Sequence, residues 1–217
     1  MNAINKIENY FACSVFILLV TLPFSDLLIR EIIKPLITTF TKIPASQTLV
    51  SHLTLLIGFS GAIIASREDK LLSLSNYSLF DEKLTGYIVN VSRWLSIFIT
   101  LMLMVGGIGL VLVELSFEHP AYVAPNLPRW LFQTAIPLGF FIITLHLLSK
   151  MKKNIFSIEG LVFLLISVGF LFSHDFFREN SFIIYMALAL FITAILNGAP
   201  IFIILSGFAI LFFWYDY

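Results

Sequence analysis

The sequence predicts an all-α protein, a polytopic bundle of helices embedded in a membrane. Of its 217 residues, 59% are hydrophobic and only 12% are charged, whereas about a quarter of the residues in a soluble domain are charged. Apolar runs long enough to cross about 30 Å of hydrocarbon recur along the chain. The 13 basic and 13 acidic residues give a net charge of zero, which creates no field to attract a polyanion. Soluble enzymes and nucleic-acid binders are therefore excluded.

Charged clusters and Pro/Gly clusters divide the chain into seven predicted helical spans. These are residues 10–29, 48–66, 87–115, 130–149, 155–173, 182–197 and 201–215. The last two are short, and the helix-breaking trio Gly198-Ala199-Pro200 between them predicts a hairpin or a kink. The first run is too long for the core of a signal peptide and precedes no small-residue cleavage pattern, so we expect it to remain in the protein.

Basic residues predict the orientation of these spans, because cytoplasmic loops collect Lys and Arg. Lys150, Lys152 and Lys153 follow the fourth span with no acid before Glu159. We therefore expect the amino terminus in the cytoplasm and the 116–128 loop outside. Apolar residues recur at helical spacing over 30–46, which predicts an interfacial helix along the outer headgroups. A frayed extension of the first span is the alternative, because Pro35 either breaks or starts a helix.

Small residues form a stripe in the second span. Gly58, Ala62 and Ser66 are spaced by four residues, with Gly61 and Ala65 beside them. Small side chains let another helix backbone approach closely in a membrane, so the stripe predicts a packing face.

The titratable residues in the spans do not form a recognisable reaction centre. His52 and His146 differ in depth by roughly 20 Å, too far apart to hold one haem iron, and His119 and His174 are predicted outside. Asp26 lies near the outer end of the first span, within reach of headgroup water. We therefore predict no enzyme, no cofactor and no metal, but a structural or coupling subunit. The alternative, suggested by the four His, is a membrane anchor subunit of a redox or signalling complex.

Several motifs together resemble a known family. They are Ile-Pro-Ala-Ser at 43–46, His-Leu-Thr-Leu at 52–55, Gly-Phe-Ser-Gly-Ala at 58–62, Ala-Ser-Arg-Glu at 65–68, Leu-Ser-Leu at 72–74, Pro-Arg-Trp at 128–130 and Ala-Ile-Pro-Leu-Gly at 135–139. In order and spacing they are similar to the small permease subunit of tripartite ATP-independent periplasmic (TRAP) transporters. The resemblance covers residues 1–153. One position departs from it, because the family often has His where this chain has Leu71.

The remaining sequence resembles a different subunit of the same transporters. Asn-Gly-Ala-Pro-Ile at 197–201 is similar to the opening of the large permease subunit, which some members fuse to the small one. The resemblance thus implies a small-permease-like domain at 1–153, a linking helix and outer turn at 154–180, and the start of a large subunit at 181–217. It also implies that the chain is either a split gene product or part of a longer fused permease.

The resemblance implies a subunit for import of organic acids in the bacterial inner membrane. A periplasmic substrate-binding protein would deliver the carboxylate, and sodium symport through the large subunit would drive its import. This chain would scaffold the large permease subunit through Gly58, Gly61, Ala62, Ala65 and Ser66, and would help to dock the binding protein through its outer segments. The motif and helix-anchoring residues are expected to be His52, Arg67, Glu68, Trp130, Pro137 and Gly139.

Overall fold

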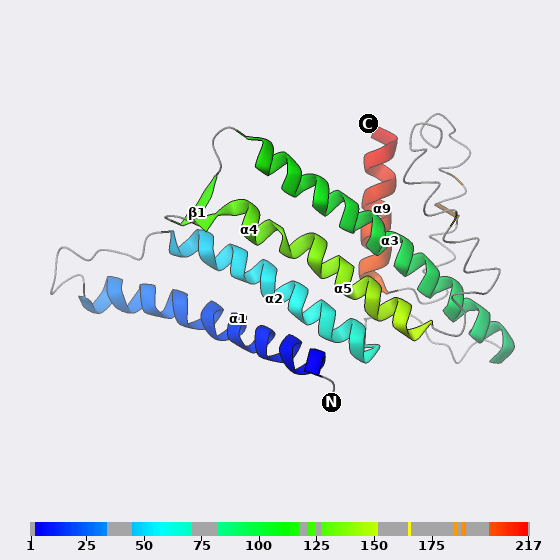
Figure 1. The fold of residues 1–217 in the computed structure, drawn as a ribbon, viewed down its shortest axis with the longest axis horizontal. Helices are drawn as coiled ribbons and strands as arrows, with labels where there is room; N and C mark the ends of the chain where they lie inside the picture. The colour runs from blue at the N-terminus through cyan, green and yellow to red at the C-terminus, as the bar shows by residue number, and fades with distance from the viewer. Residues whose placement is uncertain are drawn as a thin grey trace. The chain divides into compact units, whose positions relative to one another are not determined.

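The predicted all-α membrane fold is confirmed by the structure, a computed structural model (Figure 1). It describes residues 3–33, 45–70, 82–117, 121–124, 127–151 and 200–216, and the single positions 165, 185, 188 and 189. Four helices in the described residues are long and apolar enough to cross a membrane, and they match the first four predicted spans. They are Asn5–Ile32, Ser46–Glu68, Ser92–Ser116 and Arg129–Lys150. The predicted spans at 155–173 and 182–197 lie outside the described residues, except for those single positions.

The first span is one long helix, α1 (Ala3–Leu28), which continues as a short π-helix at Ile29–Ile33. Its 26 α-helical residues extend about 39 Å at 1.5 Å per residue, more than the hydrocarbon thickness requires. Residues 30–33 of the predicted interfacial helix belong to this π-helical continuation. Residues 34–44 of that predicted helix lie outside the described residues.

The second span, α2 (Ser46–Glu68), is bounded by two residues with left-handed backbone conformation. Ala45 before it has a φ of 59°, and Asp69 after it has a φ of 58°. Left-handed conformations are uncommon for residues other than Gly, although Asp tolerates them better than most. The N–H of Asp69 donates to the carbonyl oxygen of Ser66 at 3.4 Å, and the helix ends there.

The third span belongs to α3 (Glu82–Ser116), a helix of 35 residues. A small antiparallel ribbon follows, made of β1 (Tyr122–Ala124) and β2 (Leu127–Pro128). Tyr122 of β1 and Leu127 of β2 are exposed, whereas Val123, the middle residue of β1, is buried.

The fourth span begins as the short helix α4 (Arg129–Gln133) and continues as α5 (Ala135–Lys150). Pro137 explains the interruption, because it has no N–H to donate to the carbonyl of Gln133. The predicted span at 130–149 is thus one membrane crossing with a local break near its first turn.

The chain divides into two compact units, Met1–Ala65 with Val105–Gly139, and Ser66–Met104 with Phe140–Tyr217. In the first unit, glycines allow α5 to pack closely on its neighbours. A Cβ atom added at Gly139 would overlap the ring of Phe59 in α2. One added at Gly107 in α3 would lie 3.0 Å from Cγ2 of Ile136 and 3.2 Å from Cδ of Pro137. The start of α5 therefore contacts both α2 and α3 within this unit.

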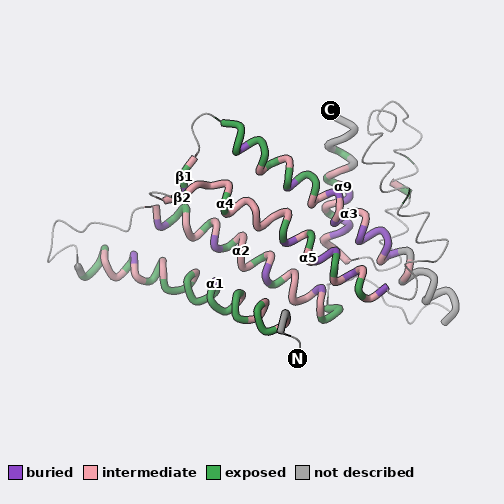
Figure 2. The backbone as a smooth tube through the Cα atoms, in the orientation of Figure 1, coloured by how far each residue is buried: buried purple, intermediate pink, exposed green. Residues whose placement is uncertain are grey.

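The second unit has its own hydrophobic core. Leu95 and Ile99 of α3 pack with Ile203 and Ile204 of α9 (Ile201–Asp216), and Ile203 is fully buried. The α9 helix begins directly after Pro200, where the sequence predicts a break. Figure 2 shows the contrast between the buried part of α3 in this unit and α1 in the other unit, which is exposed along most of its length.

Candidate functional site

Polar contacts at the helix ends and one exposed helix face are the candidate functional features. Among the residues that the structure describes, no group of three or more His, Cys, Asp or Glu side chains is arranged to hold a metal ion. His52 and His146, the two described histidines, each have a partner nearby. Nδ1 of His52 donates to the carbonyl oxygen of Thr48 at 2.8 Å, and Nδ1 of His146 lies 3.2 Å from Oγ of Ser66.

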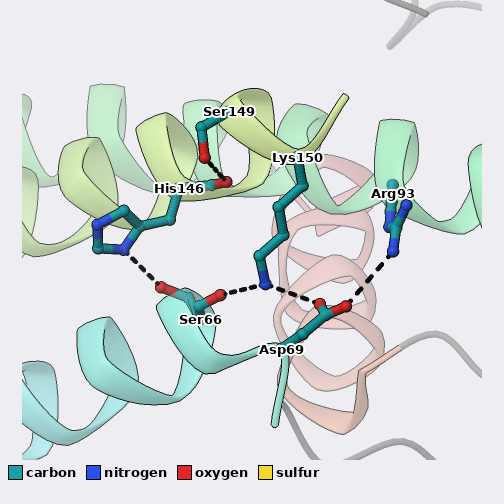
Figure 3. A network of polar contacts seen from close by, with 6 residues as sticks. All are labelled: Ser66, Asp69, Arg93, His146, Ser149 and Lys150. Atoms are coloured by element: carbon teal, nitrogen blue, oxygen red, sulfur yellow. Dashed lines mark hydrogen bonds and ion pairs between the residues drawn. The ribbon is translucent and has the colours of Figure 1, made fainter. Parts of the chain in front are cut away.

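The first feature is a charged cluster in the second unit, at the ends of α2 and α5 and on α3. We call it the Asp69 cluster. It comprises two ion-pair networks at neighbouring positions of the chain, Asp69 with Arg93 and Lys150, and Glu68 with Arg67 and Lys70. Figure 3 shows Asp69, Arg93 and Lys150 from it. Lys150 donates both to Oδ1 of Asp69, at 2.9 Å, and to the carbonyl oxygen of Ser66, at 2.6 Å. The second contact satisfies one of the carbonyls that the C-terminal turn of α2 leaves without an intrahelical partner.

Each carboxylate of the Asp69 cluster is shared by two cations. Asp69 contacts Lys150 and also Arg93, whose Nη2 lies 3.4 Å from Oδ2. Glu68 contacts Lys70 at 2.9 Å and Arg67 at 3.6 Å. The hydrogen bond from Lys150 lowers the pKa of Asp69 below its ordinary value, and the hydrogen bond to Glu68 raises the pKa of Lys70. In both cases the hydrogen-bonded partner stabilises the charged form of the side chain.

A second ion pair lies in the first unit, where Arg129 binds Glu114 through two hydrogen bonds. Nε donates to Oε1 at 3.1 Å and Nη2 donates to Oε2 at 2.7 Å. The Glu114 side chain is only 6% exposed, although it is one turn from the end of α3. The backbone N–H of Arg129 also donates to the carbonyl oxygen of Ala121 at 2.8 Å. Arg129 thus fixes the β1–β2 ribbon to the end of α3.

The first unit also has a pocket of about 410 Å³ between the end of α1 and the start of α2. Asp26 is buried in its wall and pairs with Arg30 at 2.7 Å. The sequence predicts Asp26 near the outer end of the first span, and the structure places it two residues before the end of α1. Its carboxylate is held by a neighbouring cation, as expected for an acid close to hydrocarbon.

The predicted small-residue stripe divides in the structure. Gly58 and Gly61 are exposed, and a Cβ atom added at either would have no neighbour within 4 Å. Ala62 and Ala65 are half-buried. Ser66 is fully buried, with its hydroxyl next to His146 and its carbonyl bound by Lys150.

Gly58 and Gly61 belong to a longer exposed face of α2. We define the α2 exposed face by positions spaced alternately four and three residues apart along the helix: Gln47, Ser51, Thr54, Gly58, Gly61, Ala65 and Glu68. All are small or polar, and all except the half-buried Ala65 are exposed. This spacing keeps them on one side of the helix through the whole span. Hydrophobicity averages hide such a face, but the 3.5-residue spacing of its members is visible in the sequence.

The predicted anchoring residues mostly have contacts inside the chain. The ring of His52 meets the ring of Phe132 edge-on, with centroids 5.2 Å apart. Gly139 is buried against Phe59, Pro137 packs at Gly107, and Trp130 is half-buried in α4. The sequence interpretation singled out Arg67 and Glu68 but did not identify Asp69, Arg93 and Glu114 as partners in ion pairs.

The four apolar helices show the class of protein: the chain is a multi-pass α-helical membrane protein with paired charges at the ends of its spans. Its family follows from comparison with family models. The model for tripartite ATP-independent periplasmic transporters, DctQ component, matches residues 19–157, which is more than half of the chain. The protein belongs to this family and is a membrane component of a TRAP transporter, as its motifs predicted. The family match does not support the alternative of a redox or signalling anchor. A comparison with curated proteins finds no match.

Proposed function

We propose that this chain is the small permease subunit that scaffolds the large permease subunit of an organic-acid importer. The observation that carries the proposal is the α2 exposed face within a chain of this family. Leu or Phe side chains suit a lipid-facing surface, whereas Gly58 and Gly61 leave a shallow surface where another helix backbone fits. Ala65 continues this face, and Ala62 lies beside it. Ser66 contributes from inside the chain, by holding the end of α2 against α5.

In this proposal the chain catalyses no reaction and needs no cofactor. Its share in transport is mechanical. The chain would provide a fixed surface against which the large subunit's transport unit moves, while a sodium gradient supplies the free energy for import of the carboxylate. The close packing of Gly139 on Phe59, and of Pro137 at Gly107, favours a rigid support.

The outer segments are proposed to help dock the periplasmic substrate-binding protein. The amino terminus then lies in the cytoplasm, and the β1–β2 ribbon lies on the periplasmic side. The Glu114–Arg129 pair supports this role, because it fixes the ribbon that presents Tyr122 and Leu127 to solvent. A preorganised surface loses less conformational entropy on binding than a mobile one.

The C-terminal segment is proposed to represent the start of a large subunit, after a linking helix within 154–180. The proposal rests on the resemblance of residues 197–201 to the opening of that subunit, and α9 would be its first described helix. The boundaries proposed for the three parts are 1–153, 154–180 and 181–217.

Uptake by reconstituted vesicles tests the proposed function. Labelled carboxylates would be supplied with the binding protein, the large subunit and an inward sodium gradient, with and without this chain. We expect uptake to require the chain and to stop when the sodium gradient is collapsed. Equal uptake without the chain would contradict the proposal, and so would uptake that ignores sodium.

A further inference from the structure

The pocket between the end of α1 and the start of α2 lies at the level of the lipid headgroups. It has a volume of about 410 Å³, and all of its described lining residues belong to the first unit. The first span ends at Ile32 and the second begins at Ser46, so the pocket is bounded by two span ends. Span ends lie where the hydrocarbon gives way to phosphates and water. A headgroup can therefore reach this pocket from its own layer of the membrane.

Part of the pocket wall offers hydrogen-bond donors. Ser46 is only 7% exposed, and its hydroxyl has no hydrogen-bond partner among the residues that the structure describes. Ala45, directly before α2, has no side-chain oxygen to accept from the first N–H groups of the helix. Arg30 uses Nη2 to bind Asp26 and keeps further guanidinium N–H groups for another acceptor. Such donors suit the oxygens of a phosphate.

Carboxylates lie in the same wall, beside these donors. Asp26 is only 8% exposed and lies 2.7 Å from Nη2 of Arg30. Glu31 follows Arg30, is exposed, and has no ion-pair or hydrogen-bond partner in the described part of the chain. Its carboxylate can therefore accept from an ammonium group. One pocket thus combines donors for a phosphate with an acceptor for an ammonium group.

We infer that the pocket binds the headgroup of an ethanolamine phospholipid, with the phosphate against Arg30 and Ser46 and the ammonium group against Glu31. Both contacts are charge-assisted hydrogen bonds, which are stronger than neutral ones. Pro23 and Leu27 add apolar surface to the lining, which suits the glycerol carbons of the lipid.

The pocket is large enough for this occupant, since its volume falls in the range of pockets that hold small ligands. The bound headgroup would join the end of α1 to the start of α2. This inference rests on the pocket alone, so it does not depend on how the chain contacts the large subunit or on which solute the transporter carries.

Lipid retention measured by native mass spectrometry tests the inference. The full chain would be titrated separately with phosphatidylethanolamine, with phosphatidylcholine, whose methylated nitrogen has no N–H donor, and with phosphatidylglycerol, which has no ammonium group. We expect phosphatidylethanolamine to bind most tightly. Equal binding of the three lipids would overturn the inference, and so would tighter binding of phosphatidylglycerol.

Two substitutions separate the two halves of the headgroup. Glu31→Gln should weaken phosphatidylethanolamine binding about ten-fold, the scale of one hydrogen bond to a charged group, and should leave phosphatidylcholine binding unchanged. Ser46→Ala should weaken the binding of both lipids about five-fold, because they share the phosphate. If Glu31→Gln weakens both lipids alike, the carboxylate does not recognise the ammonium group. If Ser46→Ala changes neither, the phosphate is not bound at the start of α2.

Glu8→Gln is the matched control, because it removes an acid of the same helix that does not line the pocket. It should leave the binding of all three lipids unchanged, and the helical circular dichroism of every variant should match that of the original chain. An effect of Glu8→Gln as large as that of Glu31→Gln would contradict the site. A further arm adds soluble phosphoethanolamine: if it competes with the lipid at equal affinity, the pocket binds a soluble compound and the lipid assignment is wrong.

Discussion

Lys150 donates a hydrogen bond from Nζ to Oδ1 of Asp69 at 2.9 Å, across 81 positions of sequence. The same Nζ donates to the carbonyl oxygen of Ser66. One side chain at the end of α5 thus holds both the last turn of α2 and the residue that follows it. Near the same level, His146 of α5 contacts Oγ of Ser66. The second and fourth spans are therefore joined at these ends by specific polar contacts as well as by packing.

Removing the Asp69 carboxylate should make thermal stability less dependent on acid pH. The folded-state pKa of Asp69 is lowered, first of all by the hydrogen bond from Lys150, so the ionised carboxylate stabilises the fold. That contribution is fully present above the ordinary Asp pKa of about 3.9 and is lost as the pH falls through the lower folded-state pKa. The effect should be about 1 kcal/mol or less, because the side chain is 57% exposed.

Melting curves of the original chain and Asp69→Asn, recorded from neutral to acid pH, check this. The variant should melt at a lower temperature at neutral pH, and the two curves should converge as Asp69 becomes protonated. A difference that stays constant over the whole pH range would contradict the role given to the carboxylate.

Gly139→Ala should destabilise the chain by about 1–3 kcal/mol, the usual cost of overpacking. Its new methyl group would overlap the ring of Phe59. Gly106→Ala in α3 is the control, since a methyl group there has no neighbour within 4 Å. Because Ala favours helix over Gly, that variant should be neutral or more stable. Unfolding in mixed micelles measures both, and equal stability of the two variants would refute close packing at Gly139.

The two partners of the Glu114–Arg129 pair should respond unequally to substitution. Arg129→Gln leaves a buried carboxylate without its cation, whereas Glu114→Gln leaves an arginine whose side chain is 43% exposed. We expect the larger fall in melting temperature for Arg129→Gln. Adding Glu114→Gln to it should restore part of the loss. Equal and additive losses would show that the two side chains do not interact.

Thr144→Val should cost about 0.6 kcal/mol, the average for a hydrogen bond between membrane helices. The hydroxyl of Thr144 lies 2.9 Å from Oγ1 of Thr100, and both residues are buried in the second unit. A double-mutant cycle with Thr100→Val isolates the contact between them. A coupling energy of zero would mean that each hydroxyl serves only its own helix backbone.

The sequence was sufficient to predict the first four spans, because crossing a bilayer needs a local property, a run of about 20 apolar residues. The predicted span at 48–66 differs from Ser46–Glu68 by two residues at each end. The start of α9 directly after Pro200 and the family were also predictable, from a helix-breaking residue and from the order of short motifs.

The paired charges were not predictable in the same way. Asp69 and Lys150 are far apart in sequence, and their contact depends on how the ends of α2 and α5 are aligned in depth. In the sequence, Glu114 is simply a residue near the end of an apolar run. Arg129 reaches it because the chain reverses direction through the β1–β2 ribbon. Hydropathy and helical spacing describe one helix at a time, so they do not determine such contacts.

Co-purification with the large permease subunit tests the central proposal most directly. The tagged chain would be isolated from membranes that contain the large subunit, as the original sequence, as Gly58→Leu with Gly61→Leu, and as Ser14→Leu. Ser14 is a small, exposed residue of α1 outside the α2 exposed face. We predict that the large subunit is recovered with the original chain and with Ser14→Leu but is lost with the double glycine variant. Full recovery with the glycine variant, at equal expression, would contradict the scaffold role assigned to α2.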